Sequence, residues 1–312
     1  MSLKASLGDR PVIYEIVPPR KDTSRFSTEL RGVEEVSGEK RITAINVPEL
    51  IKRRSQAGRI QYSPATIPPE EYAMMIKDYK ESIVNIISPR LEKEEFLRRT
   101  GKILNDYRIP NVVVVGKERH DDPMPGPSAI EALRMLSEKR GPHVALGGIC
   151  IFSRETTKTE MKGDDAGSMS EDKRVWLKAE AGCDFVTSQI TFDVNSTVGF
   201  LKAYQDRCES TGKKPITVFV SIATVPTPGI LSLLETLDVV VPVSVKERLQ
   251  VSGNMGRESL RISSGIFSEI MSRARDEGVR VPLGLQVEQV GVNSGELSLE
   301  LLDATYPSLK EN

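Results

Sequence analysis

Cysteine and histidine are scarce in this 312-residue chain, and their scarcity excludes several kinds of site. The three cysteines, Cys150, Cys183 and Cys208, lie too far apart in the sequence for a local zinc knuckle, and only His120 and His143 could join them. We therefore expect neither a metal site nor a disulfide framework. A serine-hydrolase triad would need one of the two histidines, and we expect His143 to begin a strand. Triad chemistry is not expected.

The chain also lacks an excess of either charge and any long apolar run. Its 43 Lys and Arg residues oppose 44 Asp and Glu residues, so the formal net charge is −1. The chain therefore has no excess of positive charge that would favour nucleic acid or an anionic membrane as a partner. Apolar runs such as 112–115 and 237–243 are too short to span a bilayer, and no secretory leader opens the chain. We expect a soluble, cytoplasmic protein.

Short β-rich runs recur along the chain at intervals that leave room for a helix. Many are apolar on both faces, as is typical of buried parallel strands. The expected strands are 11–17, 41–46, 83–87, 111–115, 143–149, 184–189, 216–222 and 282–289. Helical patterns, several of which end at a glycine, cover 69–79, 92–105, 128–139, 170–181, 197–210 and 264–277.

This alternation predicts one (β/α)8 barrel domain over residues 1–312. A doubly wound open sheet is the competing architecture, but no Gly-x-Gly-x-x-Gly follows the first strand to support it. Two long connections, 47–68 and 153–169, follow predicted strands on the face where barrel enzymes keep their sites. The second could equally be a tolerated surface insertion.

One carboxyl group stands out near the start of the chain. A period of two places Ile13, Glu15 and Val17 on one face of the first strand, and the pair Pro18-Pro19 must end that strand. Barrel enzymes place proton donors at the interior-facing, C-terminal ends of their strands. The segment alone leaves open that Glu15 faces solvent on an edge strand.

Three segments together resemble the methylenetetrahydrofolate reductase family. They are YEIVPPR at 14–20, PGPSAIEALRML at 125–136 and KAEAGCDFVTSQITFD at 178–193. The resemblance runs at modest similarity from about residue 11 to 290. It implies a (β/α)8 barrel that binds a flavin, usually FAD, at the C-terminal ends of its strands. The implied reaction reduces a methylene-bearing tetrahydrofolate, or a related reduced pterin, to its methyl form.

The resemblance also implies roles for particular residues. Glu15 matches the catalytic glutamate, and Gln189 matches the glutamine that contacts the pterin at the end of the sixth barrel strand. Arg174 precedes Lys178 by one helical turn, so the two could meet a diphosphate, although they could equally form a solvated basic stripe. The expected flavin contacts are Glu118, Ser128, Gly147, Ile149, Glu171, Arg174 and Lys178.

The chain departs from the family pattern at several places. Gly116-Lys117-Glu118 stands where Arg-Gly-Asp is usual, and Ile86 replaces an expected histidine. A threonine on the second strand has become Ala44 or a neighbour, and VSIATVPTP stands where the seventh strand usually carries a proline-glycine segment. These changes leave room for a member that uses FMN, another reductant or no flavin.

The implied chemistry needs a proton donor and a hydride. Opening a methylene bridge between two pterin nitrogens requires a proton on the departing nitrogen, and a carboxylic acid can donate it at neutral pH only if its pKa is raised. NAD(P)H or a redox partner protein would supply the electrons. Two alternatives stay open: a pterin-binding or methyl-transfer protein without a flavin, and a demethylating enzyme with the pterin as acceptor. A homo-oligomer and a subunit of a reductase complex are both compatible with the sequence.

Overall fold

Eight parallel strands close into a barrel, with the first strand paired to the last. The computed structural model describes residues 2–21, 26–50, 66–116, 124–154, 157–158, 168–291 and 294–311. The strands, in order round the barrel, are β1 (Val12–Ile16), β2 (Ile42–Val47), β3 (Ser82–Ile87), β4 (Asn111–Val115), β5 (Ala145–Cys150), β8 (Phe185–Ser188), β9 (Thr217–Ala223) and β10 (Leu283–Gln289). The predicted (β/α)8 barrel is therefore confirmed, and the doubly wound alternative is wrong.

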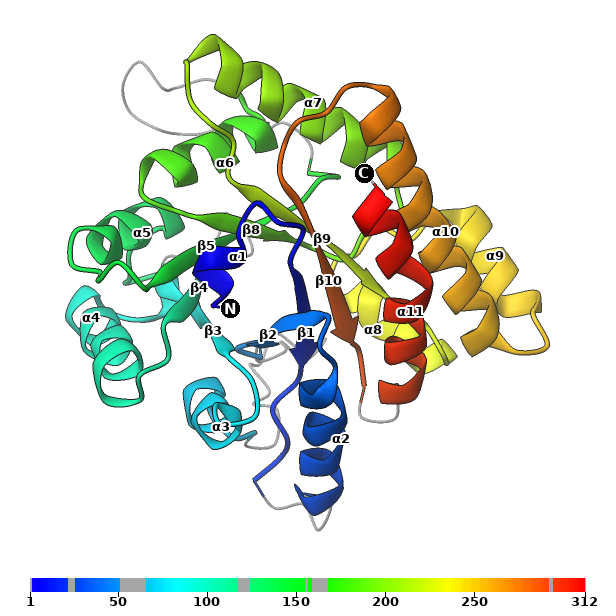
Figure 1. Cartoon of the computed structure of the whole chain (residues 1–312), viewed down its shortest axis with the longest axis horizontal. Helices are drawn as coiled ribbons and strands as arrows, with labels where there is room; N and C mark the ends of the chain where they lie inside the picture. Colours follow the sequence, from blue (N-terminus) through cyan, green and yellow to red (C-terminus); the bar gives the residue numbers. More distant parts are fainter. Residues whose placement is uncertain are drawn as a thin grey trace.

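Helices surround the strands on the outside (Figure 1). They are α1 (Leu3–Ser6), α2 (Phe26–Gly38), α3 (Pro69–Ile76), α4 (Lys93–Gly101), α5 (Ala129–Ser137), α6 (Glu171–Glu180), α7 (Val194–Ser210), α8 (Pro228–Thr236), α9 (Val243–Val251), α10 (Met255–Asp276) and α11 (Gly295–Glu311). A 3-10 turn follows β3 at Ser88–Arg90, and a π-helical turn ends α4 at Lys102–Asp106. Every residue of β3 and of β9 is buried, as expected for parallel strands that are covered on both faces.

Apolar side chains fill the lower half of the barrel, which is the half at the N-terminal ends of the strands. The short helix α1 lies over the N-terminal ends of the strands, and its Leu3 joins the interior cluster. The barrel residues of that cluster are Ile13, Ala44, Ile83, Val113, Ala145, Phe185 and Phe219. The rings of Phe185 and Phe219 meet edge to face with their centroids 5.5 Å apart. The interior is thus a packed core at this end, and barrel enzymes keep their sites at the other end, where the strands have their C-termini.

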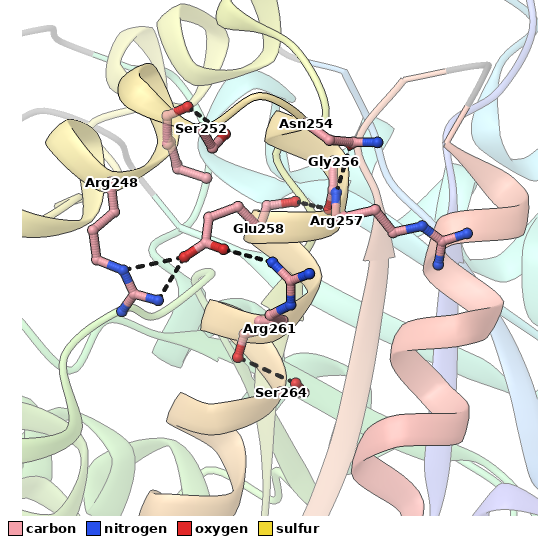
Figure 2. Close-up of polar contacts among 10 residues, drawn as sticks. Arg248, Ser252, Asn254, Gly256, Arg257, Glu258, Arg261 and Ser264 are labelled. Carbon is pink, nitrogen blue, oxygen red and sulfur yellow. Dashed lines mark hydrogen bonds and ion pairs between the residues drawn. The ribbon is translucent and has the colours of Figure 1, made fainter.

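Between β9 and α10 the chain makes an excursion through α8 and α9 that the sequence patterns did not predict. Arg248 of α9 donates to Glu258 of α10 over 2.6 Å, and Arg261 donates to the other oxygen of Glu258 over 2.8 Å (Figure 2). These two guanidinium groups lower the pKa of Glu258. Asn254 caps α10 by accepting the N–H of Arg257, so α10 begins at Met255, nine residues before the predicted start at 264.

The structure differs from the predictions in two other places. His143 lies in a turn rather than in a strand, because β5 begins only at Ala145. The connection 153–169 contains a two-residue antiparallel pairing of β6 (Thr157–Lys158) with β7 (Ser168–Met169). Most of 47–68 lies outside the described residues. In the part of the chain that the structure describes, no helix combines the length and apolar character needed to cross a membrane.

The packing of the barrel interior can be tested at Gly147. A Cβ there would lie 2.5 Å from Phe185 Cζ and 2.7 Å from Val113 Cγ2. We expect Gly147→Ala to lower the free energy of unfolding by about 1–3 kcal/mol, because the added methyl group overpacks the core. Gly265→Ala is the matched control, since Gly265 lies in α10 with open space around its Cβ position. The control should be neutral or stabilising by up to about 1 kcal/mol. Urea unfolding of both variants makes the comparison, and equal stabilities would contradict the packing.

Candidate functional site

Two carboxyl groups lie side by side at the C-terminal mouth of the barrel. Glu15 of β1 and Glu288 of β10 are partners in the strand register, and both side chains are partly buried. The side-chain amide of Gln286 donates to both, over 3.2 Å to Glu15 Oε2 and 3.0 Å to Glu288 Oε1. Asn46 of β2 donates to Glu15 Oε2 over 2.6 Å. Three neighbouring strands thus hold one acid pair by hydrogen bonds.

The environment of this pair favours its protonated form. Burial raises the pKa of Glu15 to about 7, although the hydrogen bond from Asn46 opposes the shift. Burial and the charge of Glu15 together raise the pKa of Glu288 well above its usual value, opposed by hydrogen bonds with Ser221 and Gln286. Two carboxylates this close cannot both ionise without repulsion, so the pair retains a proton at neutral pH. It can therefore act as a general acid.

Polar side chains occupy the layers around the acid pair. The strands of such a barrel are tilted, with a shear of about eight. Residues at the same level along the barrel axis are therefore offset by one position from the hydrogen-bonded register between neighbouring strands. The register then gives one inward-facing layer containing Glu15, Asn85, Ile149 and Ser221, and a layer beneath it containing Asn46, Val113, Thr187 and Gln286. Val113 and Ile149 are the two apolar members, and both contact the apolar cluster below. Asn46, Asn85 and Gln286 are 0%, 6% and 2% exposed. The upper half of the barrel is thus polar where the lower half is apolar.

The structure brings Glu15 together with Asn46, Gln286 and Glu288 rather than with Gln189. Gln189 follows β8 at the mouth, where its backbone N–H donates to the carbonyl of Cys150. Its side-chain amide donates over 2.8 Å to the carbonyl of Leu237, the residue that ends α8. Gln189 therefore ties the sixth barrel strand to the excursion, and its contact with a pterin stays a prediction.

Several predicted flavin contacts gather between β5 and α6. Glu171, at the start of α6, accepts the N–H of Ile151 over 3.0 Å, and Arg174 Nε lies 3.6 Å from its other oxygen. Arg154 also donates to Glu171, over 3.0 Å. Lys178 is buried and donates to the carbonyl of Ile149. These residues, which the resemblance implies as flavin contacts, therefore lie close together. Each of them already binds another group of this chain.

Two further predicted flavin contacts lie elsewhere. Ser128 caps α5 in a reciprocal pair of hydrogen bonds with Glu131, 2.8 and 3.3 Å long. Gly147 lies beneath the ring of Phe185 in the packed half of the barrel. Glu118 lies outside the described residues.

Taken together, these contacts do not fit a flavin diphosphate as the side chains lie. Lys178 is only 8% exposed, and burial together with the nearby Arg154 lowers the pKa of Arg174. The pair therefore presents neither the solvated basic stripe nor an open cationic surface. The flavin stays a prediction from the resemblance.

Comparison with known proteins gives a fold match. The structure resembles that of an uncharacterized protein from Clostridium thermocellum that binds two copies of 5-methyl-5,6,7,8-tetrahydrofolic acid. The two share 20% sequence identity with a TM-score of 0.73, and the match covers 98% of this chain and 99% of the other. The likeness shows the fold. No family model and no curated protein matches the chain.

Sequence reasoning identified Glu15 as a site residue but missed Glu288 and the nearby amide side chains of Asn46, Asn85 and Gln286. A signal for two of them was present, because Gln286 and Glu288 alternate with apolar residues in the last strand and share its inner face. Asn46 likewise shares a face with Ala44 near the end of β2. Among the described residues, no group of three or more His, Cys, Asp or Glu side chains is placed to hold a metal ion.

The raised pKa of Glu15 predicts how stability depends on pH. The unfolded carboxyl loses its proton near 4.5 and the folded one near 7, so the stabilising contribution is complete below pH 4.5 and is lost as the pH rises through 7. We expect the wild type to lose on the order of 1–3 kcal/mol between pH 5 and 8 relative to Glu15→Gln. Urea unfolding at several pH values measures this difference.

Glu247→Gln is the control for this titration, since Glu247 is an exposed residue of α9. That variant should keep the pH dependence of the wild type. Parallel stability curves for Glu15→Gln and the wild type would contradict a raised pKa at Glu15.

Proposed function

We propose that the C-terminal mouth of the barrel binds a reduced pterin of the tetrahydrofolate type and that Glu15 donates a proton to it. The observation that carries this proposal is the acid pair itself. Glu15 keeps its proton to about pH 7 while Asn46 and Gln286 hold its position. The tetrahydrofolate bound by the similarly folded Clostridium thermocellum protein supports the choice of ligand.

Protonation is the step that one-carbon chemistry on a pterin needs from the protein. A methylene group that bridges two ring nitrogens is released from one of them when that nitrogen receives a proton, and the remaining N–CH₂ unit becomes an electrophile. The proton comes from the carboxyl of Glu15, which becomes a carboxylate. Asn46 and Gln286 already donate to its Oε2 and can stabilise the negative charge that develops there.

Glu288 completes this proton-donating unit. Its carboxyl group accepts a hydrogen bond from the same Gln286 amide, and the charge on Glu15 raises the pKa of Glu288. Because the two titrate as a pair, Glu288 can hold the shared proton when Glu15 has released its own. The pair then returns to its starting state by taking up one proton from water.

In its finer form, the proposal is reduction of the methylene compound to the 5-methyl form. A hydride must then reach the electrophilic carbon, and NAD(P)H, a flavin or a redox partner would supply it. The alternative is a pterin-binding subunit or methyl-transfer protein in which Glu15 protonates the ring without any reduction. The acid pair serves both reactions, so the colour of the purified protein separates them: a yellow protein that oxidises NAD(P)H with methylene-tetrahydrofolate supports the reductase.

Substitution of the acid tests the proposal directly. We expect Glu15→Gln to lower turnover of the methylene compound by about 100-fold or more, because general-acid catalysis typically contributes this much. Binding of 5-methyltetrahydrofolate, measured by calorimetry, should change by only a few fold, because glutamine has the shape of the protonated acid.

Glu247→Gln, an exposed surface substitution, serves as the control for turnover and binding. A wild type that binds no reduced folate would overturn the proposal, and normal turnover by Glu15→Gln would remove Glu15 from the role of proton donor. A colourless protein that binds reduced folate but shows no NAD(P)H-linked turnover would overturn the reductase and leave the binding alternative.

A further inference from the structure

Three buried amide oxygens around the barrel axis have no hydrogen-bond partner. They are Asn46 Oδ1, Asn85 Oδ1 and Gln286 Oε1. All three residues are at least nine-tenths buried and occupy inward-facing positions in the two layers at and below Glu15. A buried polar atom without a partner costs free energy, and native proteins contain few such atoms. Three such atoms on strands β10, β2 and β3 near one end of the barrel indicate that something else satisfies them.

The acid pair fixes which way two of these amides point. Asn46 and Gln286 each commit their NH₂ group to a carboxyl group, Asn46 to Glu15 and Gln286 to both Glu15 and Glu288. The carbonyl ends of these two amides are therefore left without a partner. The barrel interior consequently offers acceptors rather than donors at Asn46 and Gln286.

Acceptors of this kind require a ligand with N–H donors. We infer that the amide oxygens of Asn46, Asn85 and Gln286 bind N–H groups of the pterin, and that a contact of Asn85 with the N–H at position 8 selects a reduced pterin over its fully oxidised form. A tetrahydropterin carries an N–H at position 8, whereas the oxidised ring has a bare acceptor nitrogen there. An acceptor facing an acceptor repels and stays unsatisfied, which is the arrangement that gives strong rejection.

This inference rests on the proposed function but makes a separate claim about recognition. Of the three amides, Asn85 provides the cleanest test, because it makes no hydrogen bond to the acid pair. Changing it therefore leaves the hydrogen bonds of Glu15 in place.

The experiment compares the affinities of 5-methyltetrahydrofolate and folic acid by anaerobic calorimetry. We expect the wild type to prefer the tetrahydro form by tenfold or more. Asn85→Leu should weaken binding of the tetrahydro form by about tenfold and leave folic acid unchanged, so that the preference shrinks. Asn85→Asp keeps an acceptor oxygen at the same place and should retain the preference, which also guards against a leucine variant that fails to fold.

Asn111→Leu is the matched control. Asn111 also has a buried, unpartnered Oδ1, but it begins β4 at the opposite end of the barrel, where its Nδ2 donates to the carbonyl of Ser82 over 3.1 Å. The control should keep the ligand preference of the wild type even if its stability falls.

The outcomes separate the two claims. A wild type that binds neither ligand overturns the proposed function and this inference with it. A wild type that binds both with equal affinity retains pterin binding and overturns the inference alone. An unchanged preference in Asn85→Leu would likewise overturn the role of Asn85 as an acceptor for the ligand.

Discussion

The side-chain amide of Gln286 holds two carboxyl groups next to each other in a setting that cannot accommodate two negative charges. Glu15 and Glu288 face it from adjacent strands, within 3.2 and 3.0 Å of the same nitrogen. Because burial and mutual repulsion both oppose ionisation, a proton stays on the pair at neutral pH. The chemistry proposed for the barrel and the orientation of its amides both depend on this constraint.

The rest of the barrel serves this arrangement by dividing its interior in two. Phe185, Phe219 and the helix α1 fill the lower half, so that no ligand can enter from the N-terminal end. The upper half carries amides and carboxyl groups, which a packed apolar core would not tolerate without partners. A polar layer above an apolar one gives this end of the barrel a packed apolar floor and side chains that can recognise hydrogen-bonding groups.

The sequence alone predicted the barrel and the position of Glu15 near the end of the first strand, because strand periodicity and the Pro18-Pro19 stop are local signals. It left open whether Glu15 faces the interior or solvent. It could not predict that Glu288 would meet Glu15, since the register between the first and last strands depends on closure of the whole barrel. The excursion through α8 and α9 was missed because a run such as 239–243 reads equally well as a buried strand. The resemblance placed Glu171 and Lys178 near Ile149, but it carried no information that both would bind backbone atoms.

The titration of the Glu15 carboxyl group tests the central claim most directly. Carbon-13 labelling of the glutamate side chains allows its NMR signal to be assigned by its loss in Glu15→Gln and then followed from pH 4 to 9. The account predicts a midpoint near 7, because burial opposes ionisation of this carboxyl group. A midpoint near 4.5 in the wild type would contradict it, because Glu15 would then be an ordinary ionised carboxylate.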